Sequence, residues 1–244
     1  PRSKRGPASA FEIADRVLDS DTVVVPQVEA MAAAETLLAR SATVGATLYV
    51  YAREAVAAVL TLDDVVVGPS RGPGTISHLP VGGPASCRCG ATGCLEASVG
   101  ESAVAAAAYR AGVVPEPAIG QVIAAAENGH RAAHDLLVER ARLLGRGVAL
   151  ARDVFNPDRV VLLGQAFTGY RPGVAHVTAS FAATSVLEPL HPMVSSLGPR
   201  VQALAACTAA LRPVYADPLG TLRKADARDQ PRRLGRPTDP VSQG

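Results

Sequence analysis

Three of the four cysteines of this chain lie within eight residues, and this cluster constrains the fold more than any other feature of the sequence. Cys87, Cys89 and Cys94 follow His78 in a segment rich in glycine and proline. Three thiolates and one imidazole are a standard ligand set for tetrahedral zinc. A secreted disulfide framework would distribute its cysteines along the chain. The pattern therefore predicts a metal site in a reducing compartment, the cytoplasm; the simpler alternative is three neighbouring buried thiols.

The predicted role of the metal is structural. Four protein ligands leave no coordination position for water, so we do not expect Lewis-acid catalysis. Gly90 and Gly93 lie between Cys89 and Cys94, where glycine lets the backbone turn tightly and direct N–H groups toward sulfur. The fourth cysteine, Cys207, lies alone in an apolar helical segment, and we predict that it is a buried core thiol.

The composition argues against several classes of protein. With 244 residues, of which 48% are hydrophobic and 19% charged, the chain can form one or two folded domains. No stretch approaches about 20 uninterrupted apolar residues, and no basic-then-apolar leader is present, so neither a membrane span nor a secretory signal is expected. A net charge of +2 and 4% aromatic residues do not indicate a nucleic-acid-binding surface. Because Pro1 is the first residue, we expect processing or a longer polypeptide.

Hydrophobic periodicity predicts alternating strands and helices, which is typical of an α/β protein. We expect short β-branched or apolar strands at residues 22–25, 46–51, 55–60, 65–67 and 159–163. We expect helices at residues 11–18, 30–40, 102–111, 119–128, 131–155, 173–183 and 201–211. A long irregular segment, residues 68–94, separates the two halves and contains the cysteine cluster.

Residues 77–100, SHLPVGGPASCRCGATGCLEASVG, resemble the signature of the ROK family of repressors, open reading frames and sugar kinases. The matching positions are His78, Cys87, Cys89, Gly90, Gly93, Cys94 and Glu96. Two further segments, residues 156–167 and the helix beginning at residue 201, are similar to later parts of the family pattern. The resemblance covers about residues 11–220.

The resemblance implies an α/β protein with the actin-like ATPase (ribonuclease H-like) fold, in two lobes with an incomplete N-terminal lobe. Residues 1–10 are expected to be flexible because they are polar, basic and contain proline and glycine, and the resemblance implies that residues 11–100 form the rest of the N-terminal lobe with the zinc loop. Residues 101–222 would form a mostly helical C-terminal lobe, and residues 223–244 a disordered, Arg-rich tail. The family also implies structural zinc and assembly into dimers or tetramers.

Several positions that serve catalysis and ligand binding in the family's kinases differ here. Glu29 occupies the position of the base Asp, and Thr75 replaces a sugar-binding Glu. The phosphate loop expected after residue 51 reads AREAVAA and lacks every glycine, and Gln165 replaces a glycine near the adenosine. The resemblance places His78 and Glu96 at the ligand as well, although Glu96 could equally cap the following helix.

These departures favour a non-catalytic effector or dimerisation domain of a ROK-type transcriptional regulator. Its DNA contacts would lie in a module upstream of Pro1, and its effector would be a sugar or sugar phosphate. ATP and Mg²⁺ are not expected as cofactors. Two alternatives remain open: an ATP-dependent sugar kinase that uses Glu29 as base, and an interaction protein that keeps the fold without a ligand.

Overall fold

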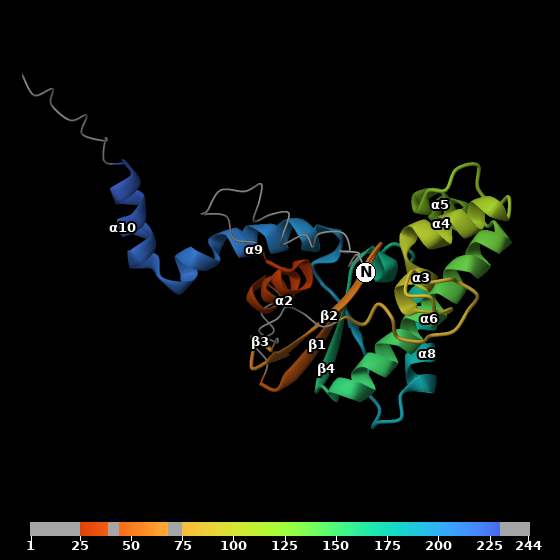
Figure 1. The fold of residues 1–244 in the computed structure, drawn as a ribbon, viewed down its shortest axis with the longest axis horizontal. Helices are drawn as coiled ribbons and strands as arrows, with labels where there is room; N and C mark the ends of the chain where they lie inside the picture. Colours follow the sequence, from red (N-terminus) through yellow and green to blue (C-terminus); the bar gives the residue numbers. More distant parts are fainter. Residues whose placement is uncertain (1–24, 39–43, 68–74, 230–244) are drawn as a thin grey trace, which may run out of the picture.

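A five-stranded mixed sheet forms the centre of the protein in the computed structural model, which describes residues 25–38, 44–67 and 75–229 (Figure 1). The strand order is β3-β2-β1-β4-β5. The first three strands pair antiparallel, whereas β4 pairs parallel with β1 and β5 pairs parallel with β4. The strands are β1 (Ala46–Ala52), β2 (Val56–Leu62), β3 (Val65–Val67), β4 (Arg159–Leu163) and β5 (Met193–Val194).

Two tight turns build the antiparallel part of the sheet. Asp63 and Asp64 connect β2 to β3, and both have positive φ angles, 49° and 65°. This is the conformation of a two-residue type I′ hairpin turn, and aspartate tolerates it better than most residues. Residues 53–55 connect β1 to β2, because Ala52 and Val56 are the last paired residues of that hairpin.

One face of the sheet packs against helices α6 (Arg131–Phe155) and α8 (Gly173–Thr184). The two helices approach closely at Gly145, where a Cβ atom would lie 2.3 Å from the carbonyl oxygen of Val177. Helix α6 ends at Phe155; the next residue, Asn156, has a left-handed φ of 43° and precedes a proline. The observed bounds of this helix agree with the prediction from periodicity.

The opposite face packs against helices α2 (Gln27–Leu38) and α9 (Val201–Ala216), as Figure 1 shows. Met31 and Tyr49 are both buried in this layer. Since successive side chains of β1 point to opposite faces and both faces are covered, nearly the whole strand is buried. A continuous apolar strand is therefore the expected sequence at this position.

Shorter helices surround this three-layer centre. The chain also forms α3 (Leu95–Val99), α4 (Glu101–Arg110), α5 (Ile119–Glu127), α7 (Gln165–Thr168), the 3-10 helix η1 (Gly198–Arg200) and α10 (Pro218–Asp229). Helices α4 and α5 pack around the first half of α6 in a third apolar cluster. Helix α10 contacts α9 and projects away from the sheet in Figure 1.

The long predicted elements are confirmed, whereas α3, α7, α10 and β5 are not apparent from periodicity. The predicted helix at 11–18, almost all of the strand at 22–25, and the flexible segment 1–10 lie outside the described residues. The proposed lobe boundary at residue 100 does not coincide with a break in the sheet, because β1 pairs with β4 across it.

Two further predictions need correction. Cys207 is exposed rather than buried, because the side of α9 that faces the sheet carries Val201 and Ala205 instead. The prediction of disorder from residue 223 is wrong for residues 223–229, which are helical in α10. Residues 230–244 lie outside the described part of the chain.

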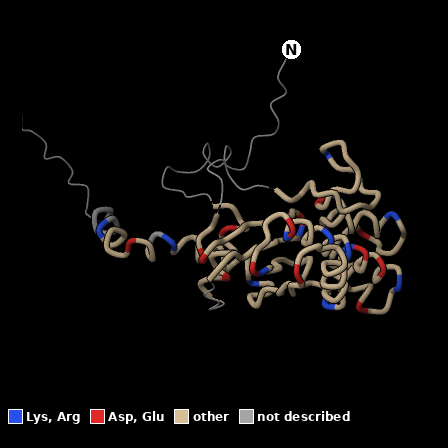
Figure 2. The backbone as a smooth tube through the Cα atoms, turned by 90° about the horizontal axis from the view of Figure 1, so that it is seen from below, with Lys and Arg blue, Asp and Glu red and all other residues tan. Residues whose placement is uncertain are grey.

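Charges of both signs are interspersed over the described chain (Figure 2). This distribution accords with the small formal charge of +2 for the whole sequence. Within residues 25–38, 44–67 and 75–229, no helix combines the length and the apolar character that a membrane span requires.

Candidate metal centre and adjoining cavities

The predicted metal ligands converge in the structure. One ligand atom from each of His78, Cys87, Cys89 and Cys94 lies within 4.8 Å of the other three. The Sγ atom of Cys87 is 3.4 Å from Nδ1 of His78, and the Sγ atoms of Cys89 and Cys94 are 3.6 Å apart. Sulfur ligands about 2.3 Å from a tetrahedral ion would lie about 3.8 Å apart. The cluster could therefore hold a metal ion, and its donors are those that zinc prefers.

The loop between the ligands is shaped by its glycines. Gly90 and Gly93 have φ angles of 92° and 77°, which side-chain-bearing residues rarely adopt. A Cβ atom at Gly93 would lie 2.9 Å from the backbone of Gly82, so this position also requires close approach. Isolated bridges pair Pro80 with Cys94 and Ser86 with Thr92, which closes the loop.

The thiols of the cluster have different environments. A hydrogen bond from the backbone of Ala91 is the main reason that the pKa of Cys89 falls to about 7. Cys94 is 3% exposed, and burial raises the pKa of its thiol to about 12. Cys89 therefore supplies thiolate near neutral pH more readily than Cys94, before any metal charge acts on either thiol.

Glu96 connects the loop that carries the four candidate ligands, residues 78–94, to the sheet; we call this segment the metal loop. Its Oε2 atom accepts hydrogen bonds from the backbone N–H of Val56, at 3.0 Å, and from Oγ of Ser77, at 2.8 Å. The alternative, that Glu96 caps the following helix α4, is not what the structure has, because the N–H of Ser102 in the first turn of α4 bonds to Glu54 instead. Oε2 of Glu96 therefore already accepts two hydrogen bonds from within the protein.

The four predicted ligand-binding residues do not share one cavity. His78 and Glu96 line a cavity of about 750 Å³ beside the metal cluster, which we call the metal-side cavity. Glu29 lines a different cavity, between α2, β3 and α9. Thr75 is exposed, and its Oγ1 atom accepts a hydrogen bond from the backbone N–H of Ser77.

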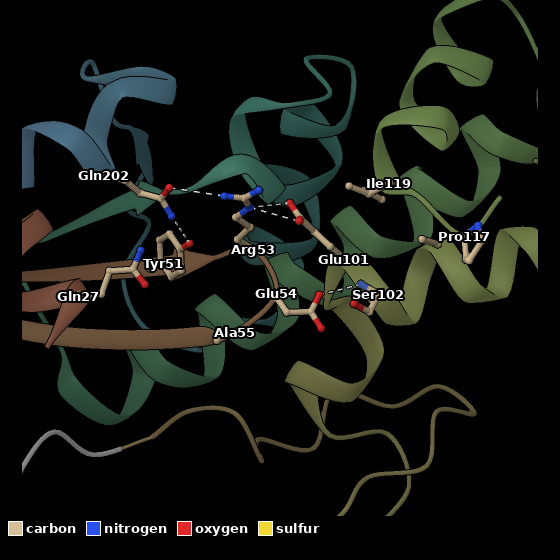
Figure 3. A pocket seen from close by; sticks show the side chains of 11 residues that line it. Gln27, Tyr51, Arg53, Glu54, Ala55, Glu101, Ser102, Pro117, Ile119 and Gln202 are labelled. Atoms are coloured by element: carbon tan, nitrogen blue, oxygen red, sulfur yellow. Dashed lines mark hydrogen bonds and ion pairs between the residues drawn. The ribbon is translucent and has the colours of Figure 1, made fainter. Parts of the chain in front are cut away.

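A third cavity, of about 550 Å³, lies at the turn between β1 and β2, and we call it the turn cavity (Figure 3). Nε of Arg53 lies 3.2 Å from both carboxylate oxygens of Glu101. Oε2 of Glu54 accepts a hydrogen bond from the backbone N–H of Ser102 at 2.8 Å, in the first turn of α4. The connection between β1 and β2 therefore places the side chains of Arg53 and Glu54 against the first residues of α4.

Other residues of the turn cavity have no motif that could reveal them in the sequence. Gln202 bonds to the hydroxyl of Tyr51 at 3.0 Å and lies 3.5 Å from Nη1 of Arg53. About 150 residues separate Gln202 from these partners. Only the parallel pairing of β1 with β4 and the return of α9 to the sheet bring them together.

Sequence comparison identifies relatives along most of the chain. The model of the ROK family matches residues 13–199. Transcriptional regulators of Mycobacterium tuberculosis and Mycobacterium bovis are 44% identical over 220 residues, which cover 84% of this chain and 50% of theirs. This chain therefore spans about half the length of these curated relatives.

Solved structures with the same fold include kinases and regulators. A ROK hexokinase from Thermus thermophilus is 25% identical, with a TM-score of 0.62 over 74% of this chain and 62% of that one. A ROK family transcriptional regulator, homologous to the Escherichia coli MLC protein, is 23% identical, with a TM-score of 0.63 over 76% and 51%. A ROK glucokinase from Streptomyces griseus is 18% identical, with a TM-score of 0.63 over 80% and 70%. The expected actin-like ATPase fold is confirmed.

Proposed function

We propose that this chain, which belongs to the ROK family, is a non-catalytic effector and dimerisation domain of a transcriptional regulator. The naming of its 44% identical relatives as transcriptional regulators supports this assignment. Those relatives are about twice as long as the matched segment. We assign the DNA contacts to a part of a longer polypeptide outside this chain.

The contact between Glu54 and the first turn of α4 carries the proposal that the domain is not a kinase. Phosphoryl transfer depends on backbone amides, cations and Mg²⁺ that hold the phosphates. At the turn where the family resemblance places the phosphate loop, the carboxylate of Glu54 already accepts the N–H of Ser102. A nucleotide phosphate would meet the negative charge of Glu54, and the guanidinium of Arg53 beside it is already paired with Glu101.

The metal in this proposal is structural zinc, held by His78 and the three clustered cysteines. Zinc would connect the two sides of an irregular loop that has little regular secondary structure of its own. Since the ligands are far from their folded arrangement in an unfolded chain, the binding free energy of the ion would add to the stability of the fold.

The remaining parts of the proposal concern assembly and location. The protein would act in the cytoplasm as a homodimer or tetramer, and a sugar or sugar phosphate would serve as effector. ATP and Mg²⁺ have no role in it.

An assay of sugar phosphorylation tests the non-catalytic part of the proposal. The chain is incubated with ATP, Mg²⁺ and a panel of hexoses, and ADP formation is followed against a hexokinase as positive control. We expect no hexose-dependent ADP. Hexose-dependent ADP that Glu29→Gln abolishes, and that the exposed control Glu127→Gln retains, would instead establish the kinase alternative.

The regulatory part is tested on the longer polypeptide. Gel-shift measurements with the DNA upstream of its own coding region should give a specific complex that excess unrelated DNA does not displace. The interaction-protein alternative predicts no specific complex at any salt concentration at which the protein is folded.

A further inference from the structure

The metal cluster is buried on one side and accessible on the other. Cys94 is 3% exposed, whereas Cys89 and His78 are exposed and Cys87 is half-buried. His78, Cys87 and Cys89 also line the metal-side cavity, which has a volume of about 750 Å³. Hydrogen peroxide is little larger than a water molecule, which occupies about 30 Å³. A small hydroperoxide can therefore reach Cys87 and Cys89 through this cavity.

Cys89 and Cys94 are placed to form a disulfide with each other. Their Sγ atoms are 3.6 Å apart, and rotation of the two side chains must bring them to a separation of about 2.05 Å. Gly90 and Gly93, both with positive φ, turn the backbone between them. The Sγ atom of Cys87 lies instead 3.4 Å from Nδ1 of His78. These contacts favour the pair of Cys89 and Cys94 over a pair that includes Cys87.

The reaction of this pair with a hydroperoxide needs no other oxidant. The exposed sulfur of Cys89 attacks the O–O bond, which breaks to give a sulfenic acid and to release an alcohol, or water when the reagent is hydrogen peroxide. The buried sulfur of Cys94 then attacks the sulfenic sulfur, the S–S bond forms, and the hydroxyl group leaves as water.

The protons and electrons of this reaction balance. Two thiolates, one molecule of hydrogen peroxide and two protons give one disulfide and two molecules of water. The two sulfurs lose two electrons, and the peroxide gains them. A disulfide sulfur lacks the negative charge with which a thiolate binds a metal ion, so the oxidised cluster keeps only His78 and Cys87 as ligands.

We propose that Cys89 and Cys94 are a peroxide-sensitive pair, whose oxidation to a disulfide releases the metal ion from the cluster. Cys89 is the residue that reacts with the peroxide, and Cys94 is the resolving thiol. That a zinc ion is bound there, and that its release changes the response of a regulator, rests on the proposed function.

Oxidation would replace a long connection within the metal loop by a short one. A bound ion connects His78 to Cys94, at the two ends of residues 78–94, whereas the disulfide closes only residues 89–94. His78 and Cys87 thereby lose their connection to the buried thiol of Cys94. Because both residues line the metal-side cavity, the wall of that cavity would loosen on oxidation.

Peroxide treatment of the zinc-loaded full chain tests this inference. The chain is reduced, loaded with zinc and freed of excess metal before hydrogen peroxide is added. A chromogenic chelator measures the released zinc, and the remaining thiols are alkylated before digestion with trypsin. We expect one zinc ion to be released for each disulfide formed. Dithiothreitol with added zinc should restore the metal content, because a disulfide is reducible whereas a sulfinic acid is not.

Trypsin separates the candidate pairs. Cleavage after Arg71, Arg88 and Arg110 leaves Cys87 in peptide 72–88 and both Cys89 and Cys94 in peptide 89–110. The proposed disulfide therefore leaves peptide 89–110 without alkylation and two hydrogen atoms lighter than its dithiol form, while peptide 72–88 is alkylated. A disulfide that includes Cys87 would instead join the two peptides. This readout uses the unmodified protein and depends on no variant.

Cys207→Ser is the matched control, because Cys207 is an exposed thiol that does not belong to the cluster. The variant should release zinc with a half-time within about twofold of that of the unmodified chain. In the unmodified chain, oxidation of Cys207 shows that the peroxide was active, since its peptide begins at residue 201 and is separate from the cluster peptides. The oxidised chain should melt below the zinc-loaded chain, and reduction with added zinc should reverse the difference.

Three results would overturn the inference. They are retention of zinc when Cys207 is already oxidised, a disulfide that joins peptide 72–88 to peptide 89–110, and a loss of zinc that dithiothreitol and zinc do not reverse.

The proposed function has separate readouts. A reduced chain that binds no zinc defeats the zinc assignment, and the peptide map then still decides whether Cys89 and Cys94 form a pair. Zinc that is bound but not released by peroxide defeats the inference alone and leaves the structural role of the metal standing. The regulator assignment is decided in each case by specific DNA binding of the longer polypeptide.

Discussion

The carboxylate of Glu96 accepts a hydrogen bond from the backbone N–H of Val56 at 3.0 Å, and this bond joins the metal loop to the first residue of β2. Ser77, which precedes the first metal ligand, donates to the same oxygen. The metal cluster and the antiparallel hairpin are therefore coupled through the side chains of Glu96 and Ser77, since Oγ of Ser77 also lies 3.0 Å from the carbonyl oxygen of Val56. A change in either should be measurable in the other.

Removal of this side chain should destabilise the protein. In Glu96→Ala the buried N–H of Val56 loses its acceptor, and we expect the free energy of unfolding to fall by about 1–3 kcal/mol. Glu96→Gln keeps a carbonyl oxygen that can accept the same bond, so its loss should be smaller. Urea unfolding followed by circular dichroism measures both. Equal stability of the alanine variant and the unmodified protein would contradict the structural role of this bond.

Loss of one cysteine of the cluster should release the metal. Cys89→Ser replaces a thiolate by a much weaker zinc ligand, so zinc content by elemental analysis and melting temperature should both fall. Cys207→Ser is the matched control, because Cys207 is exposed on α9 and does not belong to the cluster. The assignment would be wrong if Cys89→Ser kept the metal content of the control.

The two glycines of the metal loop should differ in their tolerance of a methyl group. Both have positive φ, so each alanine variant incurs a backbone cost of about 1–2 kcal/mol. At Gly90 no heavy atom lies within 4 Å of the added Cβ, whereas at Gly93 the backbone of Gly82 is 2.9 Å away. Gly93→Ala should therefore lower the melting temperature and the metal affinity more than Gly90→Ala. The reverse order would show that the loop relaxes at residue 93.

Stability should depend on pH through a buried acid of α2. Glu35 is 6% exposed and accepts a hydrogen bond from Oγ of Ser195. Burial raises the pKa of its carboxyl above the ordinary value of 4.5. The hydrogen bonds from Ser195 and from the backbone of Leu197 offset part of that rise. A raised folded pKa means that the folded protein keeps a proton that the unfolded chain has lost. The contribution of Glu35 to stability is then complete below the unfolded pKa and is lost as the pH rises through the folded pKa.

Glu35→Gln removes this titration and should change the pH profile in one direction. The melting temperature of the variant minus that of the unmodified protein should become more positive between about pH 4 and about pH 8. Because both proteins carry the same metal cluster, the difference cancels the release of metal at low pH. A difference that is constant with pH, or that falls as the pH rises, would contradict the raised pKa of Glu35.

Local signals in the sequence were sufficient for the long elements and for the metal cluster. Helix α6 has an amphipathic period and a proline just after its end, and β4 is an apolar run that ends at Gly164, so both are recognised without neighbours. The ligands of the cluster lie within 17 residues of one another, so their spacing alone restricts them to one loop. Short elements such as β5 have too few residues for a period to appear.

The α/β pattern, the clustering of His78 with three cysteines and the absence of glycine from residues 52–58 can all be read from the sequence, because each depends on residues that are close in the chain. The three-dimensional arrangement was needed to show that Glu29 and His78 line different cavities, that Cys207 is exposed, and that Gln202 contacts Arg53 and Tyr51. These facts depend on parallel strand pairing and on which side of a helix meets the sheet. Such long-range contacts are selected by the burial of the whole core, and no local pattern encodes them.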